Sequence, residues 1–242
     1  MEQKVEKTLL PDPDGILLVD KPAGITSHDV VYRIRRTFQL KKVGHGGTLD
    51  PAATGLLIML IGKGTKLSNS IMGGDKVYDG IMRLGQTTTT QDAEGEILET
   101  RDISGITQEQ VLEAMAKFKG DIYQIPPMVS ALKKDGVPLY KLARKGEEIE
   151  RKERLVHIYR FDMLDFGMPD STVRVKCTKG TYIRTLCYDV GETLGCGAHL
   201  AGLRRLSSGK LSIENALPLD KILSLSREEF EKLIIPIAAS GY

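Results

Sequence analysis

The stretch GHGGTLDPAATGLLIMLIG, residues 44–62, joins a glycine-rich segment to the longest purely apolar run of the chain. A short apolar run such as Leu56 to Ile61 is typical of a buried strand. The first part holds four glycines, His45 and Asp50 within twelve residues, and Pro51 disfavours helix at the residue before it. We therefore expect a constrained turn that presents Asp50 on a rigid strand. A plain Asp-Pro turn with a hydrogen-bonding histidine fits the same spacing.

Outward from this stretch, apolar periodicity predicts strands and helices that mix without strict alternation. Residues 15–20 form an apolar run before a Lys-Pro-Ala-Gly turn, which indicates another buried strand. Capping patterns predict helices that begin near Thr26, Thr107 and Ser226. Further strands are expected at 78–84, 155–164 and 172–177, a helix at 181–194 and a polar loop at 86–95. The pattern predicts an α+β domain with a mixed, mainly antiparallel sheet flanked by helices.

One long stretch fits no regular element. Residues 125–154 are weakly periodic, with a helix-like piece at 139–144, and residues 133–160 carry nine basic and five acidic side chains. Inside a compact domain, such a stretch is typical of a functional loop or insertion.

Charge is segregated along the chain although the formal total is only +2. Residues 30–48 have five basic side chains and no acid, residues 174–210 have seven and two, and residues 75–113 have three bases and nine acids. Basic segments that converge in the fold would attract phosphates while the acidic segment faces elsewhere. Solvated helix faces and loops explain each run equally well.

The spacing of cysteines, glycines and histidines and the length of apolar runs argue against several classes of protein. Cys177, Cys187 and Cys196 are odd in number and show no C-x-x-C spacing, which argues against a disulfide framework and a zinc ribbon. The apolar run is too short to cross a bilayer, and the N-terminus is too charged for a signal peptide. Gly62-Lys63-Gly64-Thr65 has the wrong order for a phosphate loop, residues 44–47 lack a complete dinucleotide fingerprint, and the four histidines lack metal-ligand spacing. We expect a soluble cytoplasmic protein without cofactor or metal.

Two further segments carry reactive side chains. In KGTYIR, residues 179–184, Arg184 can hold a carboxylate through two hydrogen bonds and Tyr182 offers a ring and a hydroxyl. In DKVY, residues 75–78, Tyr78 stands at the start of a predicted strand. Without any functional role, residues 179–184 would be the charged start of a helix. Tyr78 would then be a tyrosine of the hydrophobic core whose hydroxyl is bonded locally.

Six ordered blocks together resemble the TruB family of tRNA pseudouridine synthases. They are LLVDKPAGITSHDVV (17–31), GHGGTLDPAATG (44–55), DKVYDGIMRLGQTTTTQDAEG (75–95), IPPMVSALKKDGVPLY (125–140), KGTYIRTL (179–186) and GCGAHLAGLRRL (195–206). The resemblance implies the pseudouridine synthase fold. It also implies isomerisation of the T-loop uridine of tRNA, in which uracil leaves its ribose, rotates and rejoins it through carbon without cofactor, metal or redox step.

By the same resemblance, Asp50 matches the nucleophilic aspartate, which attacks either the ribose C1′ or the base C6. Arg184 matches the arginine that keeps this carboxylate charged and oriented. Tyr78 matches the tyrosine that stacks on the target uracil and assists proton removal. The reacting bond of a stacked base cannot reach Asp50, so the nucleotide must flip.

The remaining matches concern substrate binding. Tyr182 and Leu203 match pocket positions, His45 matches a histidine that fills the space left by the flipped nucleotide, and Lys21 matches a lysine that braces the site. Residues 125–154 match a mobile RNA-binding insertion. The implied partner is the T-arm stem-loop of tRNA.

Relatives commonly continue into a C-terminal RNA-binding PUA module, whereas this chain ends at Tyr242. We expect one catalytic domain over residues 1–242, with a short C-terminal extension at about 210–242, no separate PUA domain, no membrane partner and a monomeric state. Two rival hypotheses are a non-catalytic RNA-binding or RNA-folding protein of the same fold and a metal-dependent nuclease that uses His45 and Asp50.

Isomerisation should survive exhaustive treatment with a chelator, because the sequence lacks a metal-ligand pattern. The measurement is turnover of a tRNA substrate before and after dialysis against the chelator, with RNA folding monitored in parallel. Loss of turnover that one specific metal restores, while the RNA stays folded, would overturn this prediction.

Overall fold

The computed structural model describes residues 11–128, 133–134, 137–138 and 149–242. The strands are β1 (Gly15–Lys21), β2 (Val43–His45), β3 (Thr54–Ile61), β4 (Lys76–Leu84), β5 (Gln86–Thr88), β6 (Ile97–Thr100), β7 (Gly120–Gln124), β8 (Lys133–Lys134), β9 (Val137–Pro138), β10 (Arg154–Asp165), β11 (Asp170–Cys177), β12 (Ala198–Ser208), β13 (Leu211–Ser212), β14 (Leu217–Pro218) and β15 (Ile235–Pro236). The helices are α1 (Ser27–Thr37), α2 (Ser68–Gly73), α3 (Gln108–Ala116), α5 (Ile183–Leu194), α6 (Leu219–Leu223) and α7 (Arg227–Lys232), with 3-10 turns at Gly62–Leu67, Ile213–Asn215 and Ile237–Ala239.

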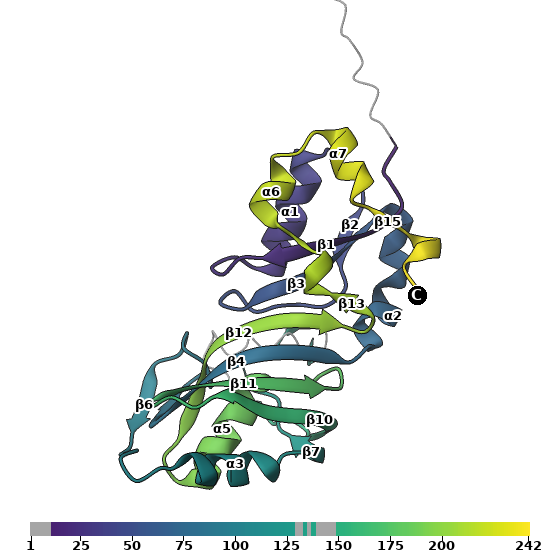
Figure 1. Ribbon diagram of the computed structural model, residues 1–242. Coiled ribbons are helices and arrows are strands. Elements are labelled where there is room, and N and C mark those ends of the chain that lie inside the picture. Colours follow the sequence, from purple (N-terminus) through teal and green to yellow (C-terminus); the bar gives the residue numbers. More distant parts are fainter. Residues whose placement is uncertain (1–10, 129–132, 135–136, 139–148) are drawn as a thin grey trace, which may run out of the picture.

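Within the described residues, eleven strands form one sheet with the central order β14-β1-β3-β12-β4-β11-β10-β7 (Figure 1). Its parallel pairs in this part of the chain are β1 with β14 and β3 with β12, and the other pairs are antiparallel. The predicted α+β class with a mixed, mainly antiparallel sheet is confirmed. None of the helices described is long and apolar enough to span a membrane.

The N-terminal half of the sheet is buried on both faces. Side chains of β1 and β3 alternate, so Leu17 and Met59 pack under α1, α6 and α7, whereas Ile16 and Ile58 enter a second cluster on the opposite face. Figure 1 shows the three helices together above β1. This two-sided burial explains why the run at 56–61 is continuously apolar rather than alternating.

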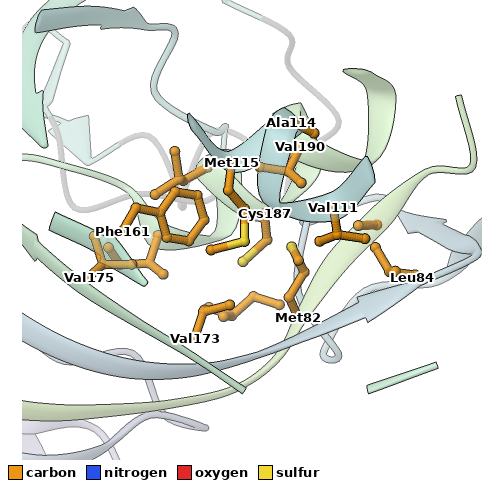
Figure 2. Close-up of a cluster of buried hydrophobic side chains, with 14 of the residues drawn as sticks. Met82, Leu84, Val111, Ala114, Met115, Phe161, Val173, Val175, Cys187 and Val190 are labelled. Carbon is orange, nitrogen blue, oxygen red and sulfur yellow. The ribbon is translucent and has the colours of Figure 1, made fainter. Parts of the chain in front are cut away.

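The second half of the sheet carries α3 and α5 on one face. Met82 and Val173 project from the strands towards Met115, Cys187 and Val190 of these helices, which Figure 2 shows in close-up. Helix α3 begins with the predicted capping box, in which Thr107 and Gln110 exchange hydrogen bonds. The boxes predicted at Thr26 and Ser226 are also confirmed.

One sequence prediction is corrected, and one strand was not predicted. The stretch 86–95 is not wholly a polar loop, because Gln86–Thr88 form β5, which pairs with β6; Thr87 and Thr88 are β-branched and buried. Strand β12, which sequence periodicity did not predict, is central to the sheet and makes bulged pairs with β4. The helix-like piece at 139–144 and most of the predicted insertion lie outside the described residues.

Residues 210–242 are built into the N-terminal half. Strand β14 pairs with β1 in parallel, and β15 pairs with β1 antiparallel. The rings of Phe38 and Phe230 stack with centroids 3.8 Å apart, and Arg227 donates to the carbonyls of Phe38 and Pro11. The predicted C-terminal extension therefore completes the layer that covers β1 and β3.

The two halves of the sheet meet at β3 and β12. Their parallel pairing has only two residue pairs, Arg204 with Thr54 and Arg205 with Gly55. We call this contact the seam. Gly55 has φ +98, and a Cβ there would lie 2.3 Å from the carbonyl oxygen of Arg205, so only glycine allows the backbones to approach this closely.

Replacing Gly55 by alanine should destabilise the protein by at least about 2 kcal/mol, because the new Cβ meets backbone and the φ angle is strained. Urea unfolding would measure the change. Gly73→Ala is the control, since a Cβ there meets nothing within 4 Å; its stability should stay the same or rise slightly. Equal stability of the two variants would contradict the role of Gly55.

Candidate active site

A cavity of about 300 Å³ opens where the two halves of the sheet meet. Five of the seven residues that the sequence singled out for the site line it: Asp50, Tyr78, Tyr182, Arg184 and Leu203. The lining also includes Gly47, Thr48, Leu49, Met72, Lys76, Thr178, Lys179, Gly180, Thr181, Ile183, Leu200 and Arg205. Tyr78 and Leu203 pack against the hydrophobic clusters of both halves, which places the cavity at the seam.

Asp50 lies in the segment between β2 and β3, which we call the Asp50 loop (residues 46–53). Its side chain is half exposed, at 50%, and therefore accessible from the cavity. The next carbonyl, that of Pro51, accepts from the backbone N–H of Gly24 at 2.9 Å and from Nζ of Lys21 at 3.1 Å. The Lys-Pro-Ala-Gly turn after β1 thus supports this loop from behind.

Arg184 stands in the first turn of α5 and bridges two carboxylates. One guanidinium nitrogen lies 3.1 Å from Oδ2 of Asp50, and another lies 3.0 Å from Oδ2 of Asp92. The arginine side chain is only 6% exposed. A buried guanidinium needs such partners, so Arg184 holds Asp50 on one side and is itself held on the other.

Asp92 is a site residue that sequence reasoning missed. It reaches the site because its loop pairs with β12, where the N–H of Leu200 donates to Gln91 and the N–H of Ala93 donates to Leu200. The expectation that the acidic segment 75–113 faces elsewhere is wrong for this residue. Its only sequence signal is its place in the block QDAEG, residues 91–95.

Tyr78 and Tyr182 supply the two aromatic rings of the cavity. Burial raises the pKa of the Tyr78 phenol, while the charge and hydrogen bond of the Arg205 guanidinium oppose that rise; at neutral pH the phenol is protonated. Tyr182 precedes α5, and the side chain of Gln124 bonds both its N–H, at 3.0 Å, and its carbonyl, at 3.2 Å. The Tyr182 ring lies 5.9 Å from the Arg184 guanidinium.

Two predicted site residues lie outside the cavity lining. Lys21 is fully buried behind the Asp50 loop, where Nζ also donates to the carbonyls of Pro22 and Ile25. It borders a second cavity of about 420 Å³, together with Asp20 and Arg204. His45 ends β2 and is half-buried; burial lowers its pKa, which favours the neutral ring, and its Nδ1 has no hydrogen-bond partner in the described structure.

Four of the seven basic side chains in the run 174–210 are bonded to partners within the protein. Arg174 pairs with Asp79, Arg204 with Asp20 and Arg184 with Asp50 and Asp92, while Arg205 donates to backbone carbonyls. The run therefore offers fewer free charges for phosphates than its composition suggests. Among the residues with described positions, no cluster of three His, Cys, Asp or Glu side chains could hold a metal ion.

Comparison with known families accounts for nearly the whole chain. The model of the TruB family pseudouridylate synthase (N terminal domain) matches residues 35–183, and that of the tRNA pseudouridylate synthase B C-terminal domain matches residues 184–239. The chain belongs to the TruB family. Its Asp50, Tyr78 and Arg184 all lie within these matched ranges, so the cavity at the seam belongs to a TruB-family fold.

Individual relatives agree with this assignment. The TruB-family chain is 52% identical to tRNA pseudouridine synthase B of Opitutus terrae, over 93% of each protein. It is 49% identical to the protein of that name from Burkholderia pseudomallei, over 93% of this chain and 74% of the relative.

Among solved structures, it resembles a Cbf5-Nop10-Gar1 complex, with TM-score 0.72 and 30% identity over 93% of this chain. The chain spans 60% of the length of that matched chain. A second resemblance is to an H/ACA RNP bound to a substrate RNA containing 2′-deoxyuridine, with TM-score 0.68 and 27% identity. These likenesses confirm the predicted pseudouridine synthase fold.

The buried Lys21 predicts how stability depends on pH. Burial lowers its pKa to about 8 from the 10.5 of an exposed lysine, so between these values the unfolded chain binds more protons and the free energy of unfolding rises with pH. Removing the group in Lys21→Met should remove this contribution. The stability advantage of the wild type over the variant should grow by up to about 2 kcal/mol from pH 7.5 to 9.5.

Urea unfolding of both proteins at the two pH values would measure this difference. Asp20→Asn serves as the control, because it removes a charge at the same second cavity and leaves the Lys21 amine in place. A difference between wild type and Lys21→Met that stays constant with pH would contradict the prediction.

Proposed function

We propose that this TruB-family chain isomerises uridine in tRNA to pseudouridine, with Asp50 as the nucleophile. The observation that carries the proposal is the Asp50 carboxylate at the cavity, 3.1 Å from a guanidinium nitrogen of Arg184. The identity of 52% to a tRNA pseudouridine synthase B along almost its whole length supports the same activity.

The reaction is an internal rearrangement, and its atoms balance without a co-reactant. In the route through the sugar, an Asp50 oxygen bonds to C1′ while the C1′–N1 bond breaks and uracil keeps the electron pair. After the base rotates, C5 bonds to C1′, the carboxylate leaves, and the C5 proton is lost while N1 gains one. In the route through the base, the same oxygen adds to C6 as the C5–C6 double bond opens. The C1′–N1 bond then breaks, the base rotates and C5 bonds to C1′, and loss of the C5 proton expels the carboxylate from C6 while N1 gains a proton. Both need a carboxylate that is held in line with the reacting atom.

The other lining residues suit a flipped uracil. The Tyr78 ring provides a surface for stacking, and its protonated phenol can donate a hydrogen bond. Leu203 and Tyr182 complete the apolar part of the wall. We assign Arg184 to orienting Asp50, Lys21 to bracing its loop, and His45, at the end of β2, to filling the space that the flipped nucleotide leaves.

We extend the proposal to the partner and the state of the protein. The T-arm stem-loop is the expected target, held by residues 125–154 and by the basic run at 30–48 through phosphate contacts. A monomer is expected because one chain supplies Asp50, Tyr78 and Arg184. A reducing cytoplasm suits the three buried free thiols. The chain is expected to act as one catalytic domain.

A single assay separates this proposal from its rivals. A T-arm hairpin and whole tRNA, each carrying tritium at uracil C5, would be incubated with the protein. Isomerisation releases the label, whereas binding alone releases none and cleavage shortens the RNA. Label released from neither RNA would overturn the proposed activity, and release from whole tRNA alone would overturn the T arm as a sufficient substrate.

Asp50→Asn should abolish tritium release while RNA affinity stays within about tenfold, because the amide keeps the shape but cannot act as the nucleophile. Asp170→Asn is a matched control; it removes the partner of Arg83 outside the cavity and should keep most of the activity. Residual turnover of Asp50→Asn above a few per cent of wild type would show that another group attacks the substrate.

A further inference from the structure

Hydrogen bonds to its backbone carbonyl groups hold the Asp50 loop in place. From Gly47 to Pro51 every backbone carbonyl oxygen accepts a hydrogen bond. Asp50 itself accepts from the N–H of Ala53 at 3.1 Å, within the loop. Lys21 and Gly24 hold Pro51. The remaining three carbonyls depend on two side chains that neither the family resemblance nor sequence reasoning assigned a role: Arg205 and Ser27.

Arg205 reaches the loop from the other half of the sheet. It is 2% exposed, and its guanidinium donates to the carbonyls of Leu56 at 2.8 Å, Thr48 at 3.2 Å and Gly47 at 3.2 Å. Within the described structure these bonds go to backbone rather than to a carboxylate. A planar guanidinium can serve three divergent acceptors at once, which an ammonium at the end of a flexible stem cannot reproduce in the same geometry.

Ser27 holds the loop from α1. Its hydroxyl donates to the carbonyl of Leu49 at 3.1 Å and accepts from the N–H of the same residue at 2.9 Å. The serine is 2% exposed, so water does not compete for these two bonds. Leu49 directly precedes Asp50, which means that the hydroxyl fixes the peptide next to the nucleophile.

We propose that Arg205 and Ser27 are positioning residues for Asp50. The two side chains form a clamp: Arg205 fixes the Asp50 loop against β12, and thereby against Tyr78 and Arg184 in the other half of the sheet, while Ser27 fixes it against α1. The inference rests on the proposed function, because it names what aligns the nucleophile of that reaction.

The chemistry explains why such a clamp matters. The Asp50 side chain is half exposed, and within the described residues its recorded ion pair is the one with Arg184. Its loop includes Gly47 at φ +127, and a glycine gives the backbone more conformational freedom than any other residue. A displacement of about 1 Å at a reacting atom can cost about a hundredfold in rate. The clamp removes that freedom before the substrate arrives.

A purely structural role for these residues predicts different results. If Arg205 and Ser27 only stabilise the fold, their replacement lowers the unfolding temperature and leaves turnover by the folded protein intact. If they position Asp50, turnover falls in protein that is still folded, RNA affinity changes little, and the loop itself becomes more mobile. The split between kcat and the Kd for RNA, together with local amide exchange, separates the two roles.

The experiment compares Arg205→Lys, Ser27→Ala and the double variant with wild type. Arg83→Lys is the matched control, since Arg83 makes a bidentate bond with Asp170 at the far end of β4 and does not line the cavity. Tritium release under single-turnover conditions, Kd for tRNA, circular dichroism and hydrogen exchange of peptides covering residues 46–57 are measured for each.

Each single substitution should lower the single-turnover rate by about tenfold to a hundredfold, with Kd within threefold of wild type. The fold-decrease in rate of the double variant should be smaller than the product of the two single fold-decreases, because both side chains act through one loop. In the variants, amides at 46–53 should exchange at least tenfold faster than in wild type. In Ser27→Ala, the Leu49 amide should be among those that exchange faster, because it loses its bond to the serine hydroxyl. Arg83→Lys should keep its rate within twofold and its exchange in this segment unchanged.

A folded Arg205→Lys and Ser27→Ala that retain rate and loop protection would overturn the clamp, as would equal losses in rate and RNA affinity. If Arg205→Lys does not fold, the rate and exchange of Ser27→Ala alone decide whether the clamp exists, because this variant deletes only one hydroxyl and is expected to fold. Failure of the wild type to release tritium would overturn the proposed function instead, and the exchange measurements would still decide whether the clamp exists.

Discussion

The contact between β3 and β12 is the constraint on which the rest of the site depends. Only two residue pairs join the two halves of the sheet there, and Gly55 allows their backbones to meet. Asp50 is delivered from one half, and Tyr78 and Arg184 from the other. A cavity at this contact can therefore combine groups from both halves, provided that the seam keeps them in register.

Arginines connect the two halves in different ways. Arg184 bridges the carboxylates of Asp50 and Asp92, Arg204 pairs with Asp20 at the end of β1, and Arg205 binds backbone carbonyls of the Asp50 loop. A buried cation is costly unless its donors are satisfied. The acceptors around the buried guanidinium groups of Arg184 and Arg205 meet that requirement, and the same bonds align the reactive loop with the cavity.

Sequence reasoning succeeded where the signal is local. The apolar runs of β1 and β3 and the capping boxes at Thr26, Thr107 and Ser226 are properties of a few neighbouring residues, and the structure confirms them. It failed where partners are distant. Strand β12 has a glycine, Gly202, and two register shifts against β4 that break its alternation, and the burial of Thr87 and Thr88 depends on packing that the local pattern does not contain.

The family resemblance, the fold class and the short glycine-rich turn that carries Asp50 can all be read from the chain alone, because each depends on contiguous residues. The folded protein was needed to reveal that Asp92 joins Arg184, that Lys21 lies behind the loop, and that Arg205 and Ser27 hold the peptide groups beside Asp50. Hydrogen bonds between residues 22 to 158 positions apart leave no periodic trace in the chain. They arise only in the folded chain, where Lys21 and Ser27 meet the loop within the N-terminal half and Arg205 meets it from across the seam, because each buried donor requires an acceptor.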